Sequence, residues 1–154
     1  MTKVAEICSF CDIGIKDAAF MESESYLAVY NIAPIVPGHS LVIPRNHQPA
    51  LMSLSEEEAR EFLAFAIKAT KLICRAYSTD AFDWALQEGT YAGQTVEHLH
   101  LHIIPRKKGD LPHPGDWFLH LEKTKCIESS KRLKITTSEM AQTVSFLKNH
   151  QQSI

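Results

Sequence analysis

Three histidines at strict two-residue spacing constrain this chain more than any other feature. His98, His100 and His102 stand inside an apolar segment and are separated by Leu99 and Leu101. In a β-strand, side chains two residues apart point to the same face of the sheet. The spacing therefore predicts a strand that buries leucines on one face and carries three imidazole rings on the other. Each ring has two polar nitrogens, which need partners if that face is buried.

Two kinds of chemistry suit such a row of imidazoles. A single histidine in a strand is most often a hydrogen-bonded or solvent-facing residue, but three in register are poorly explained in that way. Alternating histidines can bind a metal ion, since neutral imidazole is a common ligand. They can also supply a histidine nucleophile, because an imidazole nitrogen attacks phosphorus and carbonyl centres at neutral pH. The spacing alone does not choose between the two.

Length and charge restrict the class of protein. With 154 residues, 45% of them apolar and 22% charged, the chain is expected to form one globular domain with a real core. A net charge of −2 argues against a general nucleic-acid or membrane-surface binder, which usually carries a large basic excess. No apolar run approaches the roughly 18 residues that span a bilayer. We therefore expect neither nucleic acid nor membrane as a partner.

The N-terminal residues and the cysteines indicate a compartment. The first residues lack the long apolar region of a secretory signal. The cysteines are spaced unlike a disulfide framework. They are Cys8, Cys11, Cys74 and Cys126. We expect a reducing, cytoplasmic setting.

The order of expected elements points to an α+β fold. Hydrophobic patterning predicts strands over residues 26–30, 40–43 and 82–87, followed by the histidine strand at hairpin distance. Ser55 and Glu58 form a capping box before a long amphipathic helix that reaches Tyr77. Thr136 and Glu139 predict the start of a short final helix. Short loops between the strands suggest an antiparallel sheet with helices on one side.

The residues around the histidines resemble a known family. Residues 98–104 look like the motif of the histidine triad family of nucleotide hydrolases and transferases, in which single apolar residues separate three histidines. Residues 87–89, 92–96 and 105–110 resemble its fragile-histidine branch, the dinucleoside triphosphate hydrolases. Asn31 with residues 34–39 is similar to the same branch. The resemblance covers roughly residues 8–110 and leaves 111–154 as a C-terminal extension of a single domain, 1–154. It implies an antiparallel sheet of about five strands, one long central helix and a C-terminal helix.

The resemblance implies a role for each histidine of the expected active site. His100 would attack the α-phosphorus and form a nucleotidyl-imidazole intermediate, which water then hydrolyses. A nucleophilic imidazole needs one unprotonated nitrogen, while an acceptor such as a backbone carbonyl holds its other N–H. His102 and His39 would orient the ring and donate hydrogen bonds to phosphate oxygens. Phosphoryl transfer is mostly positioning and electrostatics, so no catalytic metal is required.

The resemblance also implies the substrate contacts. Gln87 and Gln94 would bind the phosphate or the bridging oxygen. Thr95 and the backbone N–H of Val96 would hold the α-phosphate. Asn31 would bind the ribose hydroxyls. Taken singly, these residues read as ordinary turn residues, and the joint pattern carries the assignment.

A second group involves the N-terminal cysteines. Alone, the Cys8-x-x-Cys11 pair could be a redox pair or chance. It is similar to a pair in bacterial-type members of the family, where it binds zinc with two histidines. The matching positions here are His47 and His98. Two thiolates and two imidazoles would make a closed, tetrahedral and therefore structural Zn²⁺ site.

Other charged and aromatic residues receive simpler interpretations. Arg106, Lys107 and Lys108 are expected to form a solvated charge cluster, with attraction of polyphosphate as the alternative. Trp117 is expected over the site or at a dimer contact. Three further histidines are expected on the surface, namely His113, His120 and His150.

These expectations combine into a cytoplasmic, homodimeric hydrolase. It would cleave dinucleoside polyphosphates at an α-phosphorus and release AMP. The alternatives within the family are a nucleoside phosphoramidase and a nucleotidyl transferase or phosphorylase. Gln87 favours the dinucleotide hydrolases. From a different class comes a nucleotide-binding interaction module without turnover.

Overall fold

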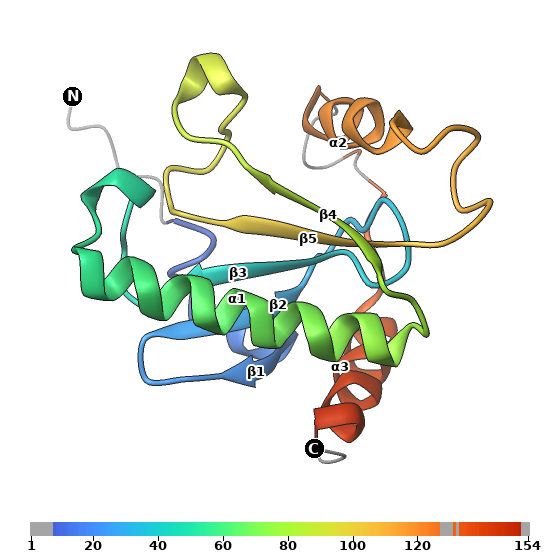
Figure 1. Cartoon of the computed structure of the whole chain (residues 1–154), viewed down its shortest axis with the longest axis horizontal. Helices are drawn as coiled ribbons and strands as arrows, with labels where there is room; N and C mark the ends of the chain where they lie inside the picture. The colour runs from blue at the N-terminus through green and yellow to red at the C-terminus, as the bar shows by residue number, and fades with distance from the viewer. Residues whose placement is uncertain (1–7, 127–130, 132, 152–154) are drawn as a thin grey trace.

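A single antiparallel sheet organises the molecule (Figure 1). The computed structural model describes residues 8–126, 131 and 133–151. Its five strands lie in the order β1-β2-β3-β5-β4, and every neighbouring pair is antiparallel. They are β1 (Ala19–Glu22), β2 (Tyr26–Tyr30), β3 (Ser40–Pro44), β4 (Ala81–Leu86) and β5 (Leu101–Arg106). The predicted α+β class and the five-stranded sheet are confirmed.

Three α-helices and three short 3₁₀ turns complete the described chain. The helices are α1 (Glu56–Ala76), α2 (Asp116–Cys126) and α3 (Thr137–Gln151); the turns are η1 (Ile13–Ala18), η2 (Leu51–Ser53) and η3 (Thr90–Ala92). Both predicted capping boxes are present: Ser55 and Glu58 exchange hydrogen bonds before α1, and Thr136 and Glu139 do so before α3. None of the helices among the described residues is long and apolar enough to cross a membrane.

The sheet separates two apolar clusters. On one face, Val42, Leu101 and Ile103 join the main core beneath α1, which runs across the near face of the sheet in Figure 1. Helix α3 adds Leu147 to this core and packs against α1, β1 and β2. On the other face, Leu41 belongs to a smaller cluster with residues of η1 and β2. Because paired residues share a face, the Leu41 partner His102 points away from α1.

The histidine segment is less regular than the sequence predicts. His102 lies in β5, but His98 and His100 precede the strand. Continued beyond Leu101, the β3–β5 register would pair Ile43 with His100 and then Pro44 with Leu99, and proline has no N–H to donate. The Leu99 N–H instead donates to the Gln48 carbonyl at 2.6 Å. The alternation survives nevertheless, since Leu99, like Leu101, lies in the main core.

The predicted solvated cluster at residues 106–108 is wrong for Arg106. Its side chain is buried, donates twice to Asp110 (2.8 and 3.0 Å) and once to Asp83 (2.9 Å). It also donates to the Pro114 carbonyl at 2.6 Å. Arg106 therefore ties β4 and β5 to the segment that leads into α2. Lys107 and Lys108 are exposed, as expected.

Two elements lie where the sequence analysis placed none. Strand β1 has four residues and a register shift opposite β2, so it offers little periodicity. Helix α2 follows a turn-rich stretch and carries Trp117, which is half-buried against Phe118. Its position beside the histidines matters for the site.

Candidate active site and metal centre

His39 and His102 are hydrogen-bonded to each other, and their partners determine which nitrogen of each ring carries the proton. The Ile35 N–H donates to Nδ1 of His39 at 3.2 Å, so this nitrogen carries no proton. The proton of neutral His39 therefore sits on Nε2, which donates to Nδ1 of His102 at 2.9 Å. That leaves the proton of His102 on Nε2. This atom is buried and has no hydrogen-bond partner among the described residues.

A buried N–H without an acceptor, which we call an orphan donor, indicates a position where a ligand can bind. Leaving a buried polar group unpaired costs about 1–3 kcal/mol, so such groups are uncommon unless something binds them. An anionic oxygen is the acceptor that would gain most from a buried N–H. The Nε2 atom of His102 is thus prepared to donate to an anion.

His100 has the opposite tautomer. Its Nδ1 lies 2.7 Å from the His98 carbonyl oxygen, which can only accept, so Nδ1 carries the proton. The free Nε2 of neutral His100 keeps its lone pair. The rings of His100 and His102 lie edge to face with centroids 5.3 Å apart. A ring with an unprotonated Nε2 and a ring with an unpaired Nε2–H therefore lie side by side.

Burial keeps these rings neutral. It lowers the pKa of His39 to about 3 and the pKa of His102 well below its ordinary value. Burial also lowers the pKa of His100, which the His98 carbonyl raises and the charge of Lys125 lowers. At neutral pH all three imidazoles are uncharged, as the assigned tautomers require.

A tight turn at Gly38 places His39 beside His102. Gly38 has φ +93°, a conformation that disfavours side chains. A Cβ there would lie 2.5 Å from Pro105 and 2.9 Å from Tyr77. The glycine allows the loop to pack against β5, which places the His39 ring beside His102.

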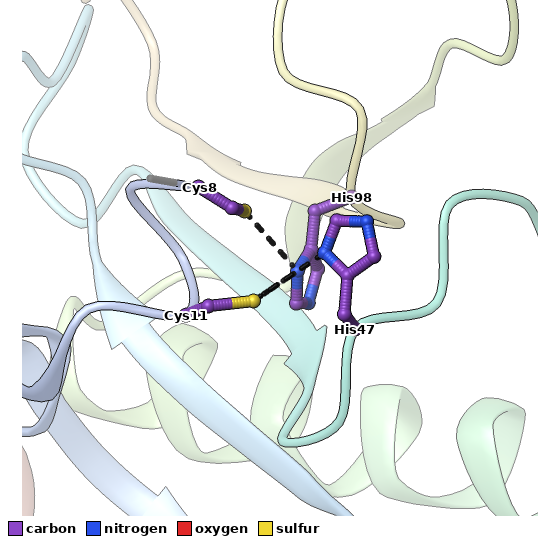
Figure 2. Close-up of side chains that lie close together, drawn as sticks. All are labelled: Cys8, Cys11, His47 and His98. Carbon is purple, nitrogen blue, oxygen red and sulfur yellow. Dashed lines mark hydrogen bonds between the residues drawn. The ribbon is translucent and has the colours of Figure 1, made fainter. Parts of the chain in front are cut away.

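A second cluster lies next to the first. Cys8, Cys11, His47 and His98 each offer one ligand atom, and these atoms all lie within 4.8 Å of one another. Figure 2 shows the two thiols and two rings converging from three separate segments. Sγ of Cys11 lies 3.4 Å from Nδ1 of His47 and 3.5 Å from Nδ1 of His98, and Sγ of Cys8 lies 3.5 Å from the same His98 atom.

This arrangement fits a tetrahedral metal ion. Bonds of about 2.3 Å to sulfur and 2.0 Å to nitrogen, at a tetrahedral angle, separate the two atoms by about 3.5 Å. Nε2 of His98 lies 2.9 Å from the Pro44 carbonyl, so it carries the proton and leaves Nδ1 free to coordinate. The four residues could hold a metal ion that joins the N-terminal segment to the sheet.

Phe10 connects the two clusters. It lies between Cys8 and Cys11, and its ring centroid is 5.7 Å from that of His98 and 5.2 Å from that of His100. The turn that carries the thiols therefore packs directly on the His100 ring.

The predicted substrate residues surround the triad but are engaged with the protein. Oδ1 of Asn31 accepts the Ala33 N–H at 2.9 Å, and its amide nitrogen lies 3.2 Å from Nε2 of His39. The Gln94 amide accepts from the Gly89 N–H and donates to the Val96 carbonyl.

Thr95 is exposed and Val96 is half-buried in the same loop. These residues border the triad, and the contacts above hold the loop in shape.

Gln87 leads to residues that the sequence analysis missed. Its amide nitrogen donates to the Ala92 carbonyl and to Glu122, and its amide oxygen accepts from Lys125. Glu122 and Lys125 belong to α2, beyond the segments that carried the family resemblance. Their one local signal is an i,i+3 pair of opposite charges.

Comparisons with known proteins identify the family of the chain. The HIT domain profile matches residues 14–109. Bis(5'-adenosyl)-triphosphatase of Dictyostelium discoideum is 34% identical over 121 residues, which cover 79% of this chain and 81% of the relative. Asymmetrical bis(5'-nucleosyl)-tetraphosphatase of Schizosaccharomyces pombe is 36% identical over 114 residues, covering 74% of this chain and 63% of the relative.

A solved structure extends the likeness to the fold. The crystal structure of a zinc-bound histidine triad family protein from Mycobacterium smegmatis is 27% identical and superposes with a TM-score of 0.64, covering 96% of this chain and 97% of that one. The profile match includes all five strands in full, together with α1. The chain belongs to the histidine triad (HIT) family.

Proposed function

We propose that this protein hydrolyses dinucleoside polyphosphates at an α-phosphorus and releases AMP. The observation that carries the proposal is the pair of opposite tautomers: a nucleophilic Nε2 on His100 beside an orphan N–H on His102. The two relatives above support the substrate class, since both are named for hydrolysis of adenosyl or nucleosyl polyphosphates.

The reaction follows from the assigned protons. Nε2 of His100 attacks the α-phosphorus, and the bond to the outer phosphate breaks with its electrons on the leaving oxygen. Nε2–H of His102 donates to an α-phosphate oxygen as negative charge develops there. Water then attacks the phosphorus, breaks the P–N bond and releases AMP with the water oxygen. The His98 carbonyl holds the Nδ1 proton throughout, which stabilises the positive charge on the modified ring.

The supporting residues take the remaining roles, with one change for His39. The resemblance implied that His39 donates to phosphate oxygens, but its N–H faces His102 and fixes the tautomer of that ring. Asn31 lies beside His39, where we place the ribose hydroxyls. Gln87 and Gln94 would exchange their present partners for phosphate or bridging oxygen. Thr95 and the Val96 N–H would hold the α-phosphate. No catalytic metal is needed, because neutral donors and positioning suffice for this chemistry.

We propose that the four-residue cluster holds a structural zinc ion. Two thiolates and two imidazoles fill a tetrahedral shell and leave no open position for substrate. The zinc-bound relative supports this choice of metal. Thiol ligands also fit a reducing, cytoplasmic setting. Elemental analysis of the purified protein should find about one zinc per chain; thiols that titrate freely in metal-free protein would refute it.

We propose that residues 1–154 form a single domain that assembles as a homodimer. Strand β4 lies at the sheet edge, and Phe82 on it is 45% exposed. Leu63 and Ile67 of α1 are similarly exposed, and they lie two turns and one turn, respectively, before Thr70, which contacts Trp84 of β4. A second β4 edge would cover unpaired backbone and apolar side chains together. Light scattering that gave a monomer mass would overturn the assembly.

Product analysis tests the reaction. The protein is mixed with diadenosine triphosphate, diadenosine tetraphosphate or an AMP-amine conjugate in oxygen-18 water, with His100→Ala as the control. Labelled AMP from a diadenosine substrate, absent with the variant, is the expected result. Release of AMP from the amine conjugate alone would identify a phosphoramidase. No turnover at all would favour a nucleotide-binding module.

A further inference from the structure

Helix α2 is hydrogen-bonded to the loop before the histidines through a compact polar cluster. We call it the α2 clasp, formed by Gln87, Gly93, Glu122 and Lys125. Nζ of Lys125 donates to the Gly93 carbonyl at 3.0 Å, to Glu122 at 3.1 Å, and to the amide oxygen of Gln87. The Gln87 amide nitrogen also donates to Glu122 at 3.1 Å.

The clasp is a close contact between α2 and the loop. Gly93 has φ +96°, and a Cβ there would lie 2.9 Å from the Gln87 amide nitrogen and 3.5 Å from the Glu122 carboxylate. The Lys125 side chain is only 13% exposed. A largely buried ammonium group is costly unless it is paired, so this position must be well satisfied.

The charge of Lys125 reaches the reacting residues. It lowers the pKa of both His100 and His102. The three imidazoles are neutral, whereas a dinucleoside polyphosphate carries a negative charge on each phosphate. The histidines account for the α-phosphoryl group, and a nearby cation would offset the negative charge of the outer phosphates during binding.

The other cations considered are either paired with more carboxylates or exposed. Arg106 is held by two carboxylates, those of Asp83 and Asp110, whereas Lys125 has one, that of Glu122. Lys107 and Lys108 are exposed on the turn after β5. Lys125 combines partial burial with contact to the loop that ends in Gln94, the residue assigned to the bridging oxygen.

We propose that Lys125 is a substrate-binding residue that holds the phosphates beyond the α-phosphorus. This inference rests on the proposed function and deepens it. A phosphate oxygen would replace the neutral Gln87 oxygen as an acceptor, because an ionised acceptor binds an ammonium more strongly. Helix α2 begins after residue 109, where the HIT match ends. The chain thus supplies its outer-phosphate contact from its own C-terminal extension.

The test compares ligands that differ only in their outer phosphates. The proteins are wild type, Lys125→Met, Lys125→Arg and the control Lys123→Met, which removes an exposed lysine from the same helix. Calorimetry measures the binding of AMP and of a methylene-bridged, non-hydrolysable diadenosine triphosphate. Kinetics measures kcat/KM for diadenosine triphosphate and for an AMP-amine conjugate, and thermal melting monitors the fold.

Lys125→Met should weaken analogue binding and lower kcat/KM for diadenosine triphosphate by about tenfold to a hundredfold. AMP binding and amine-conjugate cleavage should change less than about threefold, and Lys125→Arg should retain most of the binding. Equal losses with every ligand, together with a lower melting temperature, would make Lys125 a structural latch and overturn the proposal. So would unchanged binding.

The binding measurements distinguish a failure of this inference from a failure of the proposed hydrolysis. A wild type that binds the analogue through Lys125 but turns nothing over would refute hydrolysis and retain the phosphate contact. If Lys125→Met hydrolyses diadenosine triphosphate as well as the wild type does, hydrolysis is retained and the phosphate contact is refuted. A wild type that binds AMP and the analogue equally tightly has no outer-phosphate site and overturns the inference.

Discussion

His98 and His100 are two residues apart, yet they use opposite nitrogens. Nε2 of His98 donates to the Pro44 carbonyl and leaves Nδ1 for the cluster with the cysteines. Nδ1 of His100 donates to the His98 carbonyl and leaves Nε2 for the substrate side. Both rings are buried. The difference lies in which nitrogen faces a backbone carbonyl.

The comparison shows that residue type alone does not determine the role of an imidazole. Two carbonyl oxygens, one from β3 and one from the histidine segment itself, determine which nitrogen of each ring carries the proton and which is free. The cysteine–histidine cluster and the neighbouring buried imidazoles can therefore share one short segment while presenting different nitrogens. Substitutions in each cluster should then have different readouts.

The largest expected effect is on turnover. His100→Ala removes the nucleophile and should lower kcat by about 10⁴-fold or more. The fold should survive, because the lost hydrogen bond to the His98 carbonyl contributes only about 1 kcal/mol. Steady-state kinetics and thermal melting measure the two effects. A loss below tenfold in a folded variant would remove His100 as the nucleophile.

Substitutions in the cluster of two cysteines and two histidines should lower the stability of the protein. Cys11→Ser should abolish stoichiometric metal binding and lower the free energy of unfolding by about 4 kcal/mol when metal exceeds its dissociation constant a thousandfold. The free cysteine Cys74 on α1 offers a matched control, Cys74→Ser. Elemental analysis and urea unfolding provide the readouts. Equal metal content in both variants would refute the assigned ligand set.

Much of this comparison was accessible from sequence because its signals are local. Alternation around Leu99 and Leu101, and the two capping boxes, depend on neighbours within a few residues. The resemblance supplied His39, His47 and the cysteine pair, which the structure brings into two adjacent clusters. Whether each residue then performs its assigned role is the subject of the predictions.

The missed features depend on distant partners. The segment before β5 depends on a distant residue, because the Leu99 N–H donates to the Gln48 carbonyl instead of to a neighbouring strand. The burial of Arg106 requires Asp83 from β4. Lys125 meets Gln87 across 38 residues of sequence, and no periodicity reports such a contact. The tautomers likewise depend on carbonyl groups that only folding brings near.

An intermediate effect is expected from the orphan donor. His102→Asn removes the Nε2–H that faces the reacting phosphate and should lower kcat by about 10²–10³-fold, as loss of a transition-state donor does. The KM should change much less, because the donor acts mainly on developing charge. His113→Asn removes an exposed imidazole and serves as the control. A variant with wild-type kcat would mean that another group stabilises the phosphoryl oxygens.

The smallest expected effect is the contribution of His39 to the pH dependence of stability. Folding lowers the pKa of His39 from 6.5 to about 3, so below pH 6.5 the unfolded chain binds a proton that the folded chain excludes. Stability should therefore fall on acidification, with His39 contributing up to about 1.4 kcal/mol per pH unit between pH 6.5 and 3. Urea unfolding of wild type and His39→Asn at pH 7, 6 and 5 measures the contribution. The variant should be less stable at pH 7 yet lose stability more slowly, whereas the exposed control His120→Asn should follow the wild type. Parallel curves for wild type and His39→Asn would mean that His39 is not the neutral donor that sets the tautomer of His102.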